Sequence, residues 1–379
     1  MSGVSASAPG KLVLLGEYAV LEGAPALAVA VDRRARVRLR PRADGQITVH
    51  APQLDSTVAT ARIDAHGRLQ WQCADALAHR LQLVAQLWDG LAKEGLLTGL
   101  YPGFKLEIDT AGFMLETPVG RSKLGLGSSA ALTVALASAF VRAAGHEILL
   151  ADRSAWLARL VTMHSDWQGG QGSGVDIAAS LVGGMITYRR DPNVATPSVA
   201  ARGWPPAGTH WLWVWSGQAV STGGFLQRLR QWREASQDAY AQHMQRLGEL
   251  SQTAIAVMDG DASRFVAGVA AYSQALEDFA AASGLAIFSP SQRQLAQLAG
   301  QQGAAFKPCG AGGDIGVVVA DSQERLAMLR RSIMAAGLQP LALEVDPCGL
   351  QFAPSPVDPE PPAECGKASP GLARDGRET

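Results

Sequence analysis

A glycine- and serine-rich segment followed at once by a long apolar run leaves this chain few structural options. The segment reads Lys123-Leu-Gly-Leu-Gly-Ser-Ser-Ala-Ala131, and apolar residues at helical spacing continue to about Ala144. The glycines allow a tight turn with outward-pointing amides, and the helix then presents its positive dipole end at the same place. Such a turn binds anions, and we expect the anion to be a nucleotide phosphate.

Other interpretations of this loop exist. Gly125–Ala131 also fits the dinucleotide fingerprint G-x-G-x-x-A, but that fingerprint follows a strand, and Glu116–Lys123 does not read as one. The loop lacks the Gly-Lys-Ser/Thr ending of a Walker P-loop. A plain turn before a core helix is the structural alternative. The paired Ser128 and Ser129 favour function, because hydroxyls can bind phosphate or Mg²⁺.

Charged residues beside glycines are further candidates. Asp176 follows Gly172-Ser-Gly-Val and Lys11 opens a buried strand after Ala8-Pro-Gly10, while Glu17 stands in Gly-Glu-Tyr. Taken singly, Asp176 reads as a helix N-terminal acid and Lys11 as a solvent-facing lysine at a strand end. Beside a phosphate loop, Asp176 is a catalytic candidate and can partner a buried Lys11.

Two more segments suit close approach to a ligand. Gly310-Ala-Gly-Gly313 is too glycine-dense for a regular strand, and Ser216–Gly224 lies between a predicted strand and helix. Ser221 and Thr222 can cap that helix or hold a substrate phosphate. Cys309 reads as a buried small residue rather than a nucleophile. Five histidines show no metal-like spacing: His79, His146, His164, His210 and His243.

Composition bounds the class of protein. The 379 residues are 47% hydrophobic and 18% charged, which suits about two domains with a sizeable core. The net charge of −1 argues against nucleic-acid or membrane-surface binding driven by bulk charge. Four cysteines are too sparse for a disulfide scaffold, and no apolar stretch is long enough to span a bilayer. We expect no secretory leader and a reducing, cytoplasmic location.

Apolar periodicity predicts a mixed chain. We expect strands over residues 11–15, 25–40 (two strands joined near Asp32), 46–50, 104–109, 184–188, 211–215, 304–307, 315–320 and 341–345. We expect helices over residues 71–91, 128–144, 153–164, 224–258, 262–282, 290–302 and 323–336. Residues 190–208 contain four prolines and read as a linker, and the Pro-, Gly- and charge-rich sequence from Ala353 reads as a disordered tail.

Three motifs in order resemble those of the GHMP kinase superfamily, which includes galactokinase and the homoserine, mevalonate and phosphomevalonate kinases. They are Ala8-Pro-Gly-Lys11, Gly125-Leu-Gly-Ser-Ser-Ala130 and Gly310-Ala-Gly-Gly313, and the similarity covers about residues 6–350. The resemblance implies an α+β, two-domain fold. A domain like ribosomal protein S5 domain 2 would occupy residues 1–190, a ferredoxin-like domain residues 191–352 and the tail residues 353–379, with the active site between the domains.

Within the superfamily the chain looks most like the phosphomevalonate kinases. Leu15–Glu22, Gln168–Asp176 and Trp215–Thr222 resemble their motifs, whereas mevalonate kinases usually have His in place of Tyr18 and a metal-binding Glu near Ser165. The last motif departs from the common pattern, with Cys309 where Ser is usual and one Gly fewer.

The resemblance also implies roles for individual residues. Lys11 and Asp176 would be catalytic, and Ser129 would hold Mg²⁺. The ATP-binding residues would be Lys123, Gly125, Leu126, Gly127, Ser128, Ser129 and Ala130. The substrate-binding residues would be Glu17, Tyr18, Ser173, Gly174, Ser221, Thr222, Gly310, Ala311 and Gly312.

The implied reaction is ATP-dependent, Mg²⁺-assisted phosphoryl transfer to 5-phosphomevalonate, giving 5-diphosphomevalonate for isoprenoid synthesis. Lys11, Lys123 and Arg121 would supply the cations that offset repulsion between two anions. The alternatives are mevalonate kinase or another GHMP alcohol kinase, a non-catalytic nucleotide-binding regulator, and a dinucleotide dehydrogenase. We expect a small-molecule partner, with no nucleic acid or membrane, and leave the oligomeric state open.

Overall fold

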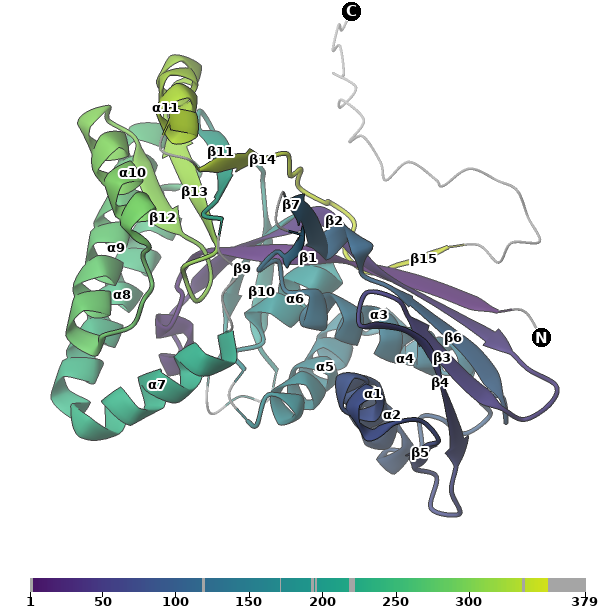
Figure 1. The fold of residues 1–379 in the computed structure, drawn as a ribbon. Coiled ribbons are helices and arrows are strands. Elements are labelled where there is room, and N and C mark those ends of the chain that lie inside the picture. Colours follow the sequence, from purple (N-terminus) through teal and green to yellow (C-terminus); the bar gives the residue numbers. More distant parts are fainter. Residues whose placement is uncertain are drawn as a thin grey trace, which may run out of the picture.

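The structure is a computed structural model that describes residues 3–117, 120–170, 172–191, 194, 196–217, 222–335 and 338–353. Two sheets organise these residues, one of nine strands and one of four, together with a separate two-stranded hairpin. Helices pack against both sheets (Figure 1). The predicted α+β fold class is confirmed. None of the described helices combines the length and apolar character that a membrane span needs.

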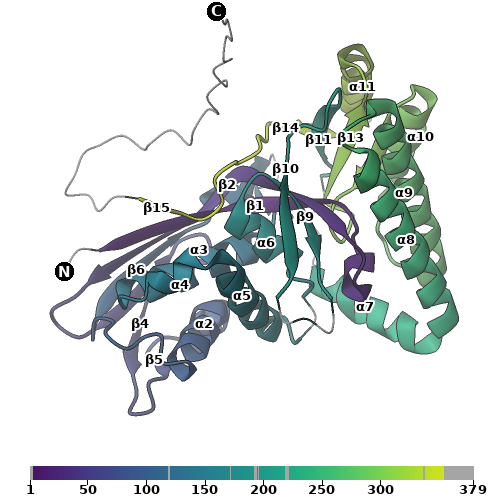
Figure 2. The same ribbon diagram turned by 180° about the vertical axis from the view of Figure 1, so that it is seen from behind.

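The larger sheet gathers strands from both ends of the chain. Its strands are β1 (Val4–Leu15), β2 (Ala26–Pro41), β3 (Ile47–Ala51), β4 (Asp55–Ile63), β5 (Leu69–Trp71), β6 (Phe104–Asp109), β9 (Met185–Arg189), β10 (Ser198–Arg202) and β15 (Gln351–Ala353). β15 pairs with the start of β1 and β10 pairs with β9. The linker prediction is therefore wrong for the residues of β10, and β15 brings the chain back beside its own beginning (Figure 2).

A single long strand, β2, forms the backbone of this sheet. It pairs with β1 along its length and shares its other edge between β9 and β6. Ala26–Val31 are all buried, whereas the end of the strand alternates, with Ala35, Val37 and Leu39 inside and the intervening arginines outside. The two strands predicted for residues 25–40 are thus one strand, because the change of partner near Asp32 does not break it.

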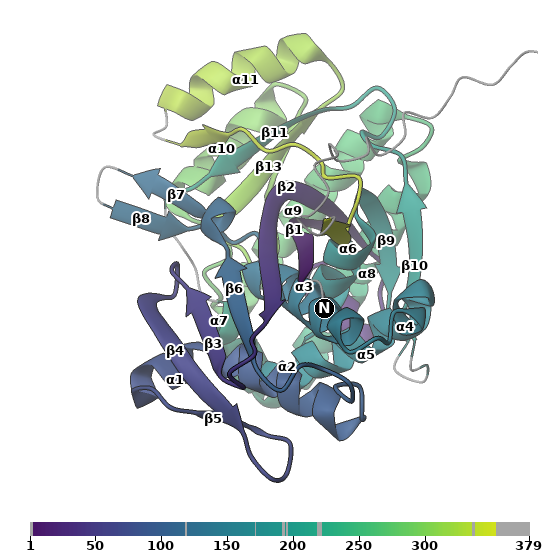
Figure 3. The same ribbon diagram turned by 90° about the vertical axis from the view of Figure 1, so that its right-hand side faces the viewer.

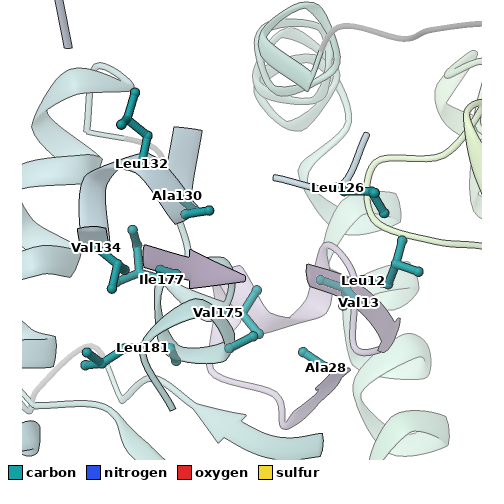
Figure 4. Close-up of a cluster of buried hydrophobic side chains, with 14 of the residues drawn as sticks. Leu12, Val13, Ala28, Leu126, Ala130, Leu132, Val134, Val175, Ile177 and Leu181 are labelled. Carbon is teal, nitrogen blue, oxygen red and sulfur yellow. The ribbon is translucent and has the colours of Figure 1, made fainter. Parts of the chain in front are cut away.

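Helices cover one face of the larger sheet. These are α1 (Asp75–Arg80), α2 (Gln82–Lys93), α3 (Ser128–Ala143), α4 (Ile148–Ala151), α5 (Arg153–Trp167) and α6 (Val175–Val182). Two short helices, η1 (Ala19–Glu22) and η2 (Ala111–Phe113), pack on α8 (Gln237–Val257) and β2 respectively. α3 packs on β1 and β2 and is buried almost all round, which explains why its sequence lacks a polar face. Leu126, Ala130 and Val134 belong to the same buried apolar core as Val175 and Ile177 of α6 and Leu12 of β1 (Figure 4).

The smaller sheet is antiparallel and lies beyond the C-terminal end of β1 (Figure 1). It has the order β12 (Ala305–Pro308), β13 (Ile315–Ala320), β11 (His210–Trp215) and β14 (Gln339–Leu341). Its helices are α7 (Thr222–Ala235), α8 (Gln237–Val257), α9 (Ala262–Ser283), α10 (Pro290–Gln301) and α11 (Gln323–Ala335). Trp213 and Trp215 face the main core on the α9 side, and Val214 faces α10 and α11. The last predicted strand, 341–345, instead lies at 339–341.

A hairpin immediately before the glycine turn corrects another expectation. β7 (Met114–Thr117) and β8 (Gly120–Lys123) pair with each other outside both large sheets (Figure 3). The expectation that no strand precedes Gly125 is therefore wrong. The hairpin is nevertheless not part of the parallel β-α-β unit of a dinucleotide-binding fold, since β8 pairs with β7 in the antiparallel direction.

Candidate active site

The Gly125–Gly127 turn is fastened to the first strand of the chain. The amide of Lys11 donates to the carbonyl of Leu126 at 2.8 Å. Gly127 has a φ of 72° and is the N-cap of α3, and a Cβ at this position would lie 2.7 Å from Cε of Lys11. No described side chain caps α3. Its first amides therefore remain available to an anion, with the Lys11 side chain lying across the turn.

The first turn of α3 holds the two predicted serines. Ser128 and Ala130 are buried, and Ser129 is half-buried. The hydroxyl of Ser129 lies 3.4 Å from Nε2 of His164 on α5. Ser129 is thus the serine hydroxyl of this turn that a neighbouring side chain can orient.

His164 is the residue around which the candidate catalytic groups gather. It is 1% exposed, and its ring stacks on Trp167 at 5.5 Å between centroids. Burial lowers the pKa of His164; the nearby Asp176 carboxylate opposes this shift and the Lys11 ammonium adds to it. The imidazole is therefore neutral at pH 7, and its unprotonated nitrogen can accept a hydrogen bond.

Lys11 and Asp176 line one cavity of about 110 Å³. Asp176 lies in the first turn of α6, after Gly174 with a φ of 85°. The turn is held because the hydroxyl of Tyr188 donates to the carbonyl of Ser173 at 2.6 Å. The cavity is lined by Lys11, Val13, Glu17, Tyr18, Val20, Leu21, Gln168, Gly172, Ser173, Val175, Asp176, Gly310 and Ala311. Residues from the first and third motifs therefore converge with the Asp176 segment on one site, beside the turn of the second motif.

Glu17 is a buried residue in the lining of this cavity. Its Oε1 accepts from Nζ of Lys307 and from the amide of Gly310, the latter at 3.3 Å, and its Oε2 has no partner among the described residues. Burial raises the pKa of Glu17, and the Lys307 ammonium opposes that shift. The next residue, Tyr18, donates its hydroxyl to the carbonyl of Ala311 at 2.7 Å.

The third glycine segment reaches from this cavity to the phosphate turn. Gly310 and Ala311 line the cavity, whereas Gly312 packs on Ile287, whose carbonyl would lie 2.5 Å from an added Cβ. The segment ends at Asp314, whose Oδ2 would lie 2.5 Å from a Cβ at Gly125. One loop therefore contacts both parts of the site.

The cavity lining does not include Lys123, Arg121 or Cys309. Lys123 is exposed on β8, and Arg121 on the same strand pairs with Glu116 at 2.6 Å rather than with the turn. Thr222 begins α7, and Ser221 lies outside the described residues. Cys309 is buried, which raises its pKa to about 12, so the expectation of an unreactive thiol agrees with its setting.

The sequence assigned no individual role to three residues that the fold brings to the site: His164, Lys307 and Asp314. The last two are the ends of a glycine-rich segment that was expected to face the site. The spacing of His164 from the other histidines gave no sign of a site, although it stands on a predicted helix just before the glycine-rich segment Gln168–Asp176. Lys307 and Asp314 flank the third glycine segment closely. Charged residues that border a glycine-rich ligand loop were the available signal.

The chain is similar in sequence to GHMP kinases. The family of GHMP kinases N terminal domain matches residues 82–184. The phosphomevalonate kinase of Streptomyces sp. (strain CL190) is 29% identical over 364 residues, covering 89% of this chain and 95% of that protein. The mevalonate kinase of Thermococcus sibiricus is 29% identical over 200 residues, covering 52% of this chain and 54% of that protein.

Solved structures show the same fold over nearly the whole chain. A Lin0012 protein from Listeria innocua superposes with a TM-score of 0.74 at 21% identity, covering 93% of this chain and 99% of that chain. The Streptococcus pneumoniae phosphomevalonate kinase in complex with phosphomevalonate and AMPPNP gives a TM-score of 0.69 at 19% identity, covering 90% and 99%. The two-domain GHMP kinase fold expected from the motifs is confirmed.

Proposed function

We propose, from the premise that this chain carries a GHMP kinase N-terminal domain, that it transfers the terminal phosphoryl group of ATP to 5-phosphomevalonate. The observation that carries the proposal is that Lys11 and Asp176 line one cavity beside the glycine turn. The choice of acceptor rests on similarity to a phosphomevalonate kinase over 95% of that protein, against about half of the mevalonate kinases.

The chemistry needs little covalent help from the protein. The bond between the γ-phosphorus and its bridging oxygen breaks, ADP leaves, and an acceptor phosphate oxygen forms the new bond. The second pKa of a phosphate monoester is about 6, so the group is largely deprotonated at neutral pH and no strong base is required. The main task is to bring two anions together, and Lys11 supplies positive charge at that point.

The site also fits Mg²⁺, which prefers oxygen ligands and completes its shell with phosphates. Ser129 and Asp176 would hold it, and the ion would neutralise charge on the phosphates. The described residues contain no cluster of three or more His, Cys, Asp or Glu suited to a metal, in keeping with a site built mainly from the nucleotide. His164 beside Ser129 would keep the hydroxyl lone pairs turned toward that position.

Three finer features belong to the same proposal. Residues 1–190 form the ATP-binding unit and residues 191–352 the second unit, with β10 and β15 completing the sheet of the first. The location is cytoplasmic, in keeping with the free thiols of Cys73 and Cys309. The tail predicted for residues 353–379 lies, apart from Ala353, outside the described residues.

Turnover of the purified protein tests the function directly. ADP release is measured with Mg-ATP and either 5-phosphomevalonate or mevalonate. We expect turnover with 5-phosphomevalonate alone. Turnover with mevalonate alone would move the acceptor to the alcohol, and silence with both while ATP binds would favour a non-catalytic regulator.

Two site variants and one control sharpen this test. Lys11→Met should lower kcat about 10²- to 10³-fold, because a cation that stabilises the transition state is lost. Asp176→Asn should lower kcat about tenfold, less than the loss expected for a general base acting on an alcohol. Lys105→Met is the matched control, since Lys105 pairs with Glu107 on β6. Near-normal turnover of the Lys11 variant would overturn the assignment.

A further inference from the structure

Lys307 is a fully buried lysine that the reaction chemistry does not use. It lies on β12 with 0% exposure and is not part of the cavity wall. Its Nζ donates to Glu17 Oε1 and to the carbonyl of Pro308, the latter at 2.6 Å, and lies 5.8 Å from the ring centre of Tyr272. A buried ammonium is costly to desolvate, so the arrangement calls for an explanation beyond packing.

The partner of Lys307 connects the two sheets at the cavity. Glu17 follows β1 of the larger sheet, and Lys307 belongs to the smaller one. The same Glu17 oxygen accepts from the amide of Gly310, and Tyr18 holds the carbonyl of Ala311. Two wall residues from the smaller sheet's loop are thus held by two residues that follow the first motif.

The wall itself has little stiffness of its own. Gly310, Gly312 and Gly313 have φ values of 65°, 96° and 80°, and glycine adopts such conformations among many others. The position of this segment therefore depends on its tethers. Without the Lys307 ammonium, the Glu17 carboxylate would stay buried with its main counter-charge gone, and it would turn toward other donors or water.

We propose that Lys307 is a positioning residue that sets the Gly310–Ala311 wall, and thereby acceptor binding, through Glu17. This inference rests on the proposed function, since it takes the cavity to be the acceptor site. The contacts expected to hold the nucleotide, namely those around the Lys11–Leu126 bond and the first amides of α3, do not include the Glu17–Lys307 pair.

Steady-state kinetics of two variants test the inference. Lys307→Met removes the charge and keeps the length of the side chain. It should raise the KM for 5-phosphomevalonate at least about tenfold and change the KM for ATP less than about twofold. Tyr18→Phe removes only the hydroxyl bonded to Ala311, and it should raise the acceptor KM about threefold even if the Lys307 variant folds poorly.

Ser273→Ala is the matched control for lost stability. Ser273 is buried on α9, where it follows Tyr272 in sequence. It donates at 2.7 Å to the carbonyl of Phe306, the residue before Lys307, and no hydrogen bond joins it to Glu17 among the described residues. It should lower Tm and leave the acceptor KM within about twofold. An unchanged acceptor KM in Lys307→Met, or equal rises for acceptor and ATP, would overturn the proposal.

Hydrogen exchange separates this inference from the proposed function. The amides of residues 309–313 should exchange at least about tenfold faster in Lys307→Met and at the wild-type rate in Ser273→Ala. If the wild type turns over no 5-phosphomevalonate, the proposed function fails, while the exchange rates still decide whether Lys307 holds the loop. Unchanged exchange in Lys307→Met would refute the tether whatever the substrate.

Discussion

Asp314 places a buried carboxylate against the Gly125–Gly127 turn. It is 5% exposed, and neither oxygen has a hydrogen-bond partner of good geometry among the described residues. Burial raises the pKa of Asp314 to about 6, although the nearby Gly125 amide and Trp215 indole oppose the shift. The Asp314 carboxyl therefore binds its proton more tightly in the folded chain than in the unfolded chain, where the pKa of an aspartate is about 4.

Stability should therefore change with pH through Asp314. Because its folded pKa is raised, its contribution is greatest at low pH and is lost as the pH rises through about 6. Between about pH 8 and pH 5 the wild type should gain about 1 kcal/mol from this carboxyl group, and Asp314→Asn should lack that gain. Urea unfolding of both proteins at the two pH values measures the difference. Parallel pH profiles would contradict the prediction.

Glu17 and Asp314 have a similar environment. Both are buried acids with incompletely satisfied oxygens, and both border the third glycine segment. Buried unpaired polar atoms are uncommon in folded proteins and tend to mark functional positions. At the scale of single residues, the buried carboxylates that cost folding free energy therefore lie beside the candidate site.

At the scale of elements, α3 links the core to the site. Its body is buried among apolar residues, while its N-terminus opens at Gly127 and its C-terminus is followed by Gly145. Both glycines have positive φ, 72° and 84° respectively. Of the two, Gly127 alone has a neighbour, Lys11, in the space that a Cβ would fill.

This difference makes a matched pair of variants. Gly127→Ala and Gly145→Ala should each lower the free energy of unfolding by about 1 kcal/mol, since an L-residue is strained in the left-handed region. Gly127→Ala should also displace Lys11 and lower kcat at least about tenfold, whereas Gly145→Ala should keep wild-type turnover. Turnover and urea unfolding of both variants check this. Equal losses of turnover would show that Gly127 acts through stability alone.

Local signals predicted some elements well and others poorly. The start of α3 at Ser128 was predicted because glycines, serines and an apolar run stand together in sequence. The β7–β8 hairpin was missed, since Gly120–Lys123 has no apolar alternation and is stabilised only by pairing with its neighbour. The strand β15 was missed for the same reason, because its three residues form a strand only by pairing with β1.

At the scale of the whole molecule, the chain is closed by contacts between its two ends. Arg34 of β2 pairs with Asp346 and donates to the carbonyl of Gly349. The amide of Gly184 donates to the carbonyl of Asp346 at 2.7 Å. With the Glu17–Lys307 pair, these contacts tie the C-terminal part of the chain to the part that contains the larger sheet at separate points.

Loss of one such tie should weaken the entire chain. Asp346→Asn leaves the Arg34 guanidinium, whose side chain is 10% exposed, without its counter-charge, and should lower the free energy of unfolding by about 3 kcal/mol. Asp44→Asn breaks the exposed pair with Arg42 and should have a much smaller effect. Tryptophan fluorescence and circular dichroism in urea should give one coincident transition. Two separate transitions would show that the sheets unfold independently.

Most elements and the three glycine-bearing motifs could be predicted from local patterns, because periodicity and turn chemistry are properties of a few neighbouring residues, and the resemblance carried by the motifs implied the fold class. Which charged residues meet depends on tertiary packing. His164 lies beside Ser129, Lys307 pairs with Glu17, and Asp314 lies against Gly125. The last two of these pairs join residues far apart in the chain, and their meeting depends on how two sheets pack, which no local pattern encodes.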